Sequence, residues 1–239
     1  MANTVKTICL DFYGLPGSGK STISHLLAEN LGRNYAVSEP SYKIDHSNSK
    51  LCRVWAKLLA VFKLMTLYPK SFIQVVSIIK KCGYNIAHSD FYLHLLNICF
   101  KIYLLKKPRY EYVIFDQGLI QAVISLFYRK CNNVSLYSIY KDFSVLVSDS
   151  VKMVEVYIKV DIDTAIERMD KRNSNISRVQ LLNRTERIVE LKKQLIMMNC
   201  FENNEYVYDS GNLNIDECVN DILKRLNNDI PKIFGEASK

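Results

Sequence analysis

The sequence predicts an α/β protein with a five-stranded parallel sheet and helices on both faces of that sheet. Two observations favour this class. Short apolar segments alternate along the chain with longer segments of helical periodicity, which is the order of βαβ units. A glycine-rich segment also separates the first apolar run, 7–13, from a helical pattern over 22–28. We therefore expect a single domain over residues 1–239.

The composition is that of an ordinary globular protein, with 49% hydrophobic and 23% charged residues. We expect no signal peptide and no membrane span, because no segment has the required apolar length. Seven scattered cysteines, none of them in a C-x-x-C pair, favour free thiols over disulfides or zinc. A cytoplasmic protein is expected, and peripheral association with the inner face of a membrane stays open.

The glycine-rich segment from Gly14 to Ser21 reads G-x-x-x-x-G-K-S, the pattern of a phosphate-binding loop. Its glycines let successive N–H groups turn toward a phosphate, and the next helix adds its positive end. Lys20 is expected to reach the β- and γ-phosphates of ATP, and the Ser21 hydroxyl to bind Mg²⁺. An ordinary glycine turn would not require Lys-Ser in this register. The residues expected around the nucleotide are Gly14, Pro16, Gly17, Ser18, Gly19, Lys20, Ser21 and Thr22.

The second strand is expected at 34–38, where Pro40 ends it and leaves Glu39 at its carboxyl edge. Open α/β sheets bind their ligands at this edge. Residues 41–50 are polar and predict a loop. Three helices should follow, over 51–65, from Pro69 to about 79, and from Ser89 to just before Pro108.

The net charge of +8 is concentrated in this helical region. Between Lys50 and Arg109 there are eleven basic residues and one acid, a local charge of +10. The excess favours an anionic acceptor or a membrane surface as partner, with a solvated helical face as the equal alternative. We do not expect a nucleic-acid partner, and the sequence leaves a homodimer open. The first helix has an apolar stripe at 51, 54, 55, 58, 59, 62 and 65, with Arg53 and Lys57 on its other side.

The third strand is expected at 112–116 and ends in Asp116, where a Walker-B acid would hold Mg²⁺. The alternative role for Asp116 is a helix cap. Gln117 stands where an ATPase motor usually has the glutamate that activates water. After Gln117-Gly118 the pattern predicts a helix to about residue 130 and another over 135–149, followed by a strand at 153–160. A helix capped by Asp163 and a helix ending near 199 come next. The chain should end with a strand at 206–210, a helix over 216–226 and a loose tail over 228–239.

Arg168 and Arg172 lie four residues apart on a predicted helix and therefore share one of its faces. Arg178 follows in a polar segment. Mobile arginines stabilise the charge that spreads over a transferring phosphoryl group. We therefore predict an arginine lid over 168–178, with a solvated basic helix end as the alternative.

The order of these motifs resembles the thymidylate kinases and deoxynucleoside kinases, which are P-loop kinases, from about Thr7 to Leu226. The resemblance rests on the phosphate loop, Glu39-Pro40, Asp116-Gln117-Gly118, the R-x-x-x-R motif and Asp209-Ser210-Gly211. It implies that residues 41–109 form the acceptor side. By this resemblance the general base or acceptor ligand is Glu39, the phosphate clamp is Arg168 and Arg172, and residues from Asp209 to Asn212 lie around the adenine. Arg178 of the lid is a further expected contact of the nucleotide.

Two departures from that family concern the acceptor. The acid-arginine pair after the third strand is Asp116-Gln117 here, and Glu39-Pro40 is not followed by Gly-Gly-Thr. We expect an ATP- and Mg²⁺-dependent kinase with a small nucleoside- or nucleotide-like acceptor. A hydroxyl is favoured, because a neutral amide binds a phosphate poorly. One alternative is a kinase for a sugar or polyol hydroxyl of a surface glycan at the membrane face. The other is a non-catalytic, nucleotide-gated binding module.

Overall fold

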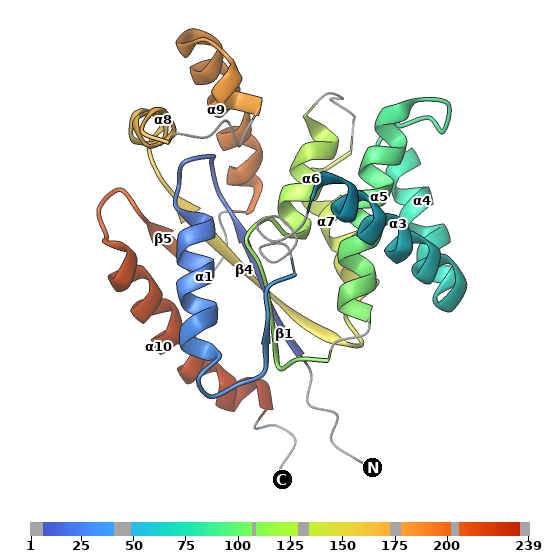
Figure 1. Ribbon diagram of the computed structural model, residues 1–239, viewed down its shortest axis with the longest axis horizontal. Helices are drawn as coiled ribbons and strands as arrows, with labels where there is room; N and C mark the ends of the chain where they lie inside the picture. The colour runs from blue at the N-terminus through green and yellow to red at the C-terminus, as the bar shows by residue number, and fades with distance from the viewer. Residues whose placement is uncertain are drawn as a thin grey trace.

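The computed structural model describes residues 7–40, 49–106, 109–128, 134–172, 178–201 and 206–234 (Figure 1). Five parallel strands form one sheet, as the sequence predicts, and the structure shows their order to be β2-β3-β1-β4-β5. The second strand is shorter than predicted, because the amides of Asn34 and Tyr35 bond to the Leu31 carbonyl at the end of the preceding helix. The strands are β1 (Thr7–Tyr13), β2 (Val37–Ser38), β3 (Tyr112–Phe115), β4 (Val151–Lys159) and β5 (Tyr206–Asp209).

Helices cover both faces of this sheet (Figure 1). One face packs against α1 (Lys20–Leu31) and α10 (Ile215–Phe234). The other face packs against α5 (Ser89–Lys106), α6 (Leu119–Phe127) and α7 (Leu136–Val145). Outside this layer, α3 (Lys50–Leu67) and α4 (Pro69–Lys81) pack against α5. The remaining helical elements are α8 (Ile162–Asp170), η1 (Arg178–Leu181), α9 (Arg184–Met198) and η2 (Asn199–Phe201).

The central strand β1 is buried along its full length and alternates its side chains between the two layers. Ile8, Leu10 and Phe12 join the core beneath α1 and α10, whereas Cys9 and Tyr13 join the core on the other face. A strand buried on both faces reads as a continuous apolar run, which is why the sequence reveals it so clearly. The core therefore fixes β1, and the carboxyl end of this strand leads directly into the phosphate loop.

Three predicted helix features are wrong in detail. The N-cap of α8 is Asp161, whose carboxylate accepts a hydrogen bond from the Thr164 amide at 2.8 Å, and not Asp163. The same helix ends at Asp170, so Arg172 lies beyond it rather than on its face. The last helix continues through Pro231 to Phe234, so a loose tail from residue 228 is wrong for 228–234, and the first glycine, the residue type that commonly follows a helix, comes only at Gly235.

The apolar stripe of α3 also lies differently from the usual core-facing arrangement. The buried residues of α3 are Ala60 and Leu64, which are 3% and 0% exposed, and Val61 is partly buried against the same core. The predicted stripe faces away from α5 and is exposed to solvent. The loop predicted at 41–50 lies outside the described residues up to 48, as does the central part of the lid, 173–177.

The cysteines that the structure describes are free thiols, as predicted. They are Cys9, Cys52, Cys82, Cys99, Cys200 and Cys218. Cys131 lies outside the described residues. Within the described ranges, no helix combines the length and the hydropathy needed to cross a lipid bilayer.

Candidate functional site

The loop between β1 and α1 has the backbone conformation that a phosphate cradle requires. Gly17 and Gly19 both have φ of 87°, a left-handed value that residues with a side chain rarely adopt. A Cβ at Gly17 would also stand 2.5 Å from the Ala165 carbonyl oxygen in α8. At Gly14 a Cβ would stand 2.3 Å from the Ile158 carbonyl oxygen in β4. Glycine is therefore required both for the turn and for the close approach of β4 and α8.

Lys20 is the first residue of α1 and is buried, with 8% of its surface exposed. Its Nζ donates hydrogen bonds to the carbonyl oxygens of Gly14 and Leu15, at 2.8 and 2.7 Å. The pKa of Lys20 is lowered to about 7, chiefly by burial; the charge of Asp116 opposes this shift and that of Arg172 adds to it. An anion beside Nζ would restore the charge, since an opposite charge favours the protonated ammonium. The site is therefore suited to a phosphate group.

Other predicted residues of the loop support this arrangement. Ser18 is fully buried, whereas Thr22 is exposed on the first turn of α1 and Pro16 is half-buried. The Ser18 carbonyl oxygen lies 2.9 Å from the Ser210 hydroxyl. This contact ties the phosphate loop to the turn after β5, which the family resemblance predicts to lie around the adenine.

Ser21 and Asp116 form the candidate magnesium site. The Ser21 hydroxyl donates a hydrogen bond to Oδ2 of Asp116 at 3.0 Å, although 95 residues separate them. Asp116 is 7% exposed, and its Oδ1 is buried without a hydrogen-bond partner among the described residues. A buried carboxylate oxygen of this kind is suited to a hard cation. No cluster of three or more metal-binding side chains occurs in the described part of the chain, so water and phosphate oxygens would complete the coordination of Mg²⁺.

Glu39 directly follows β2 and is 9% exposed. One of its carboxylate oxygens lies 3.1 Å from Nδ1 of His25, and Nε2 of His25 lies 3.5 Å from Glu29. Sequence analysis missed His25. Its position four residues after Ser21 puts it on the same face of α1, a signal that could have identified it. His25, itself held by Glu29, therefore gives the Glu39 side chain a fixed orientation beside α1.

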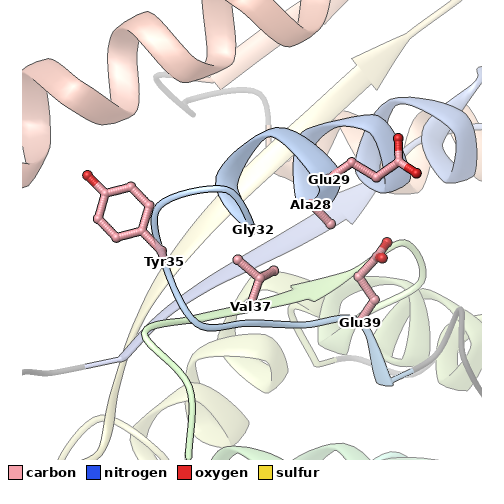
Figure 2. Close-up of a pocket in the computed structure, with 6 residues that line it drawn as sticks. All are labelled: Ala28, Glu29, Gly32, Tyr35, Val37 and Glu39. Atoms are coloured by element: carbon pink, nitrogen blue, oxygen red, sulfur yellow. The ribbon is translucent and has the colours of Figure 1, made fainter.

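A hollow of about 200 Å³ lies between the second half of α1 and β2 (Figure 2). Figure 2 shows the Glu39 side chain rising from the end of β2 toward α1. The lining contains none of the residues assigned to phosphate or metal, and it comprises Ala28, Glu29, Gly32, Tyr35, Val37 and Glu39. The hollow thus reaches Glu39 from the side away from the phosphate loop.

The arginines of the predicted lid occupy different environments. Arg168 donates hydrogen bonds to the Ser210 carbonyl oxygen at 2.7 Å and to its hydroxyl at 3.1 Å. Arg172 is exposed beyond the end of α8, and its charge acts on Lys20. The side chain of Arg178 lies outside the described residues, and only its backbone is described, at the start of η1. The structure therefore fixes Arg168 on the turn after β5, whereas Arg172 is exposed and its charge acts on Lys20.

The turn after β5 is held by Asp209. One carboxylate oxygen of Asp209 accepts a hydrogen bond from the Gly211 amide at 2.9 Å, and the other accepts from the Asn212 side chain at 2.8 Å. Both oxygens thus serve the turn itself. A contact of Asp209 with the nucleotide would come from the shape of this turn and stays a prediction.

Asp11 is a second residue that sequence analysis missed. It lies in the middle of β1, fully buried, and its Oδ2 accepts hydrogen bonds from the amides of Leu119 and Ile120 at 2.8 and 3.1 Å. A Cβ at Gly118 would stand only 2.0 Å from Oδ1 of Asp11. Asp11 therefore fixes the turn that follows Asp116, and the acid within an otherwise apolar strand was the available signal.

Comparison with solved structures identifies the fold. A thymidylate kinase from Candida albicans superposes with a TM-score of 0.51 at 15% identity, covering 96% of this chain and 94% of that chain. A shikimate kinase from Bacteroides thetaiotaomicron gives 0.52 at 14% identity, covering 92% and 98%. A deoxyadenosine kinase from M. mycoides with bound dATP gives 0.50 at 21% identity, covering 92% and 100%.

The fold is that of the P-loop kinases. The predicted resemblance to the nucleoside and nucleotide kinases is confirmed at the level of the fold, which the shikimate kinases share. Comparison with protein-family models and with curated sequences gave no match. At identities of 14–21% the likeness to these structures shows the fold, and the roles of the site residues rest on their own geometry.

Proposed function

We propose that this chain is a kinase that transfers the γ-phosphoryl group of Mg²⁺–ATP to a hydroxyl of a small acceptor. The observation that carries the proposal is the Ser21–Asp116 pair beside the buried ammonium of Lys20, with a second buried carboxylate, Glu39, after a neighbouring strand. A module that only senses a nucleotide needs the phosphate and metal residues but has no use for Glu39. The fold of the P-loop kinases supports the same interpretation.

The nucleotide side of the site would work through charge. Lys20 would exchange the loop carbonyls for phosphate oxygens and regain its full charge there. Ser21 and Asp116 would hold Mg²⁺, which when bound neutralises phosphate charge and orients the γ-phosphoryl group. Arg172, exposed beside the loop, would stabilise the charge that spreads over the transferring group.

The acceptor side would depend on Glu39. As the acceptor oxygen bonds to the γ-phosphorus and the bond to the β-phosphate oxygen breaks, the hydroxyl proton passes to the Glu39 carboxylate and ADP leaves. His25 lies against that carboxylate and would keep it oriented. Gln117, an exposed amide next to Asp116, supports a hydroxyl acceptor rather than a phosphate, because an amide binds a dianion poorly.

The fold bears on the class of acceptor. The superposed kinases are named for a nucleoside, a nucleotide and shikimate, so the fold is compatible with nucleoside and with ring-polyol hydroxyls. A nucleoside- or nucleotide-like acceptor remains our first choice, and a sugar or polyol of a surface glycan is the alternative. The free thiols fit a reducing compartment, and we propose the cytoplasm.

The decisive experiment measures ADP release from ATP against nucleosides, nucleotides, sugars and polyols, including shikimate. We expect one class to raise ADP release well above the rate with water alone. ADP release that no acceptor raises would instead support the nucleotide-gated module. The active acceptor then tests the base through Glu39→Gln, for which kcat should fall by about 10²-fold or more with little change in KM.

Glu29→Gln is the matched control for Glu39→Gln. Both carboxylates lie against His25, but the side chain of Glu29 is 58% exposed and that of Glu39 is 11% exposed. We expect Glu29→Gln to leave kcat close to the wild-type value. If Glu39→Gln also left kcat unchanged, the base would lie elsewhere or the acceptor would be a phosphate.

A further inference from the structure

The exposed face of α3 is the most unusual surface on the described part of this molecule. Its large apolar side chains are 42–74% exposed, although they repeat at the spacing of a core-facing helix. The inward face of α3 is already packed against α5 through Ala60 and Leu64. We name this exposed set the α3 stripe, and it comprises Leu51, Val54, Trp55, Leu58, Leu59, Phe62 and Met65.

The surroundings of the α3 stripe are strongly basic. No acidic residue occurs between Lys50 and Ser89, a range that contains all of α3 and α4. At 100° per residue, Lys63 falls on one border of the stripe, whereas Lys57 is half-buried on the other side of the helix, next to Leu64. Lys63 is exposed, and so is Lys70 in the first turn of α4. An apolar stripe with exposed lysines beside it is the composition of a helix that lies in a membrane interface.

Charge distinguishes the two kinds of partner that could cover this stripe. A second copy of the chain would bring its own α3 and α4 against the first, and these two helices together carry seven basic residues and no acidic side chain to pair with them. An anionic bilayer surface instead attracts every exposed lysine around the stripe while its acyl region takes the apolar side chains. Trp55, 63% exposed, is also of the type that prefers the lipid–water interface.

We propose that the α3 stripe docks this protein on the surface of an anionic lipid bilayer. In this arrangement α3 lies in the plane of the interface, with its apolar side chains in the acyl region and its lysines at the lipid headgroups. Figure 1 shows α3, α4 and α5 grouped on one flank of the molecule, away from α1 and α10. The proposal does not depend on kinase activity, because it rests on the exposed residues alone.

Trp55 provides a direct test, because it is the only tryptophan in the chain. Its fluorescence is recorded while the full-length protein is titrated with phosphatidylcholine vesicles, with and without about one third phosphatidylglycerol. We expect a blue shift and co-sedimentation with the anionic vesicles only. Both signals should disappear at about 1 M salt, where the screening length is about 3 Å.

Variants separate the contributions of charge and apolar contact. Lys63→Glu combined with Lys70→Glu should weaken binding at least about 25-fold, since each basic residue near an anionic surface contributes about fivefold. The matched control is Lys192→Glu with Lys224→Glu, which changes two exposed lysines on α9 and α10 and should bind more tightly than the first pair. Thermal melts of both double variants confirm that the fold is retained.

The apolar contribution is tested by Leu58→Gln combined with Phe62→Gln, which keeps Trp55 as the probe and leaves the core intact. Binding should fall at least about tenfold. The control, Val145→Gln with Ile196→Gln, changes side chains 68% and 70% exposed on α7 and α9 and should bind as the wild type does.

Three results would overturn the proposal. Equal binding to neutral and anionic vesicles would remove the role of charge. Anionic binding that the Leu58→Gln and Phe62→Gln variant retains would place the contact elsewhere. The third is a dimer in sedimentation velocity that this variant dissociates, together with no vesicle binding by the wild type. That result would assign the stripe to an interface between copies of this chain.

Discussion

The buried acid in β1 makes the stability of this protein depend on pH in a predictable direction. Burial raises the pKa of Asp11 to about 7, while the amides of Ile120 and Leu119 and the charge of Lys101 act against that shift. In the unfolded chain the same carboxyl titrates near 3.8. Between these values the unfolded chain has lost the Asp11 proton and the folded protein still holds it. The contribution of Asp11 to the free energy of unfolding is therefore fully present below pH 3.8 and is lost as the pH rises to 7.

The size of this effect follows from the two pKa values. From pH 5 to pH 8 the folded protein should lose about 3 kcal/mol of unfolding free energy through Asp11, at about 1.4 kcal/mol per pH unit up to pH 7. Asp11→Asn keeps an oxygen that can accept from the amides of Leu119 and Ile120 but has no proton to release. Relative to the wild type, this variant should therefore gain about 3 kcal/mol over the same range.

Urea unfolding at pH 5 and pH 8 measures this difference. The control is Asp163→Asn, which removes an exposed carboxylate from the first turn of α8 and should shift stability equally at both pH values. A difference between wild type and Asp11→Asn that stays constant from pH 5 to pH 8 would refute the reasoning. Because Asp11 fixes the turn after Asp116, the result also reports on the candidate metal site.

Three further substitutions test the phosphate side of the site. Lys20→Ala should fold normally, as a thermal melt would verify, and should lose about 10²–10³-fold in transfer rate because a transition-state charge contact is removed. A folded Lys20→Ala enzyme at the wild-type rate would contradict its role. Arg172→Ala should lower kcat by about 10²-fold with little effect on the Kd of ATP, whereas Arg168→Ala should mainly cost about 2 kcal/mol of stability through its lost hydrogen bonds. Equal effects of both changes on kcat alone would instead support a common clamp. Gly17→Ala should lower Tm more than Gly19→Ala, because both have φ of 87° but only the first Cβ meets backbone at 2.5 Å. Equal Tm values for the two variants would contradict the packing argument.

Local patterns determined the elements and the phosphate loop. The glycine spacing before Lys20 dictates a left-handed turn wherever the chain goes next, because only glycine adopts that backbone without strain. A strand buried on both faces, such as β1, is apolar at nearly every position, with Asp11 as the main exception, so it is visible without any knowledge of its neighbours. The order of strands and helices then limits the topology to a parallel sheet. For these features the sequence alone was sufficient.

The contacts between distant segments could only come from the tertiary structure. His25 meets Glu39 because β2 returns beside α1, and no local pattern states which carboxylate a histidine will face. Asp11 meets Leu119, 108 residues away, through the packing of α6 on the central strand. Arg172 was predicted on the helix of Arg168 but lies beyond the end of α8, because the ends of helices depend on caps and packing more than on spacing.

The α3 stripe shows the same division most clearly. Helical periodicity establishes that Leu58 and Phe62 share a face, since positions four apart lie one above the other on a helix. It does not establish what that face meets. Packing decided the question in favour of the smaller inward face around Ala60, which lets α3 approach α5 closely and leaves the large side chains outside. Periodicity is a property of the chain alone, whereas burial depends on which surfaces the rest of the fold has left to cover.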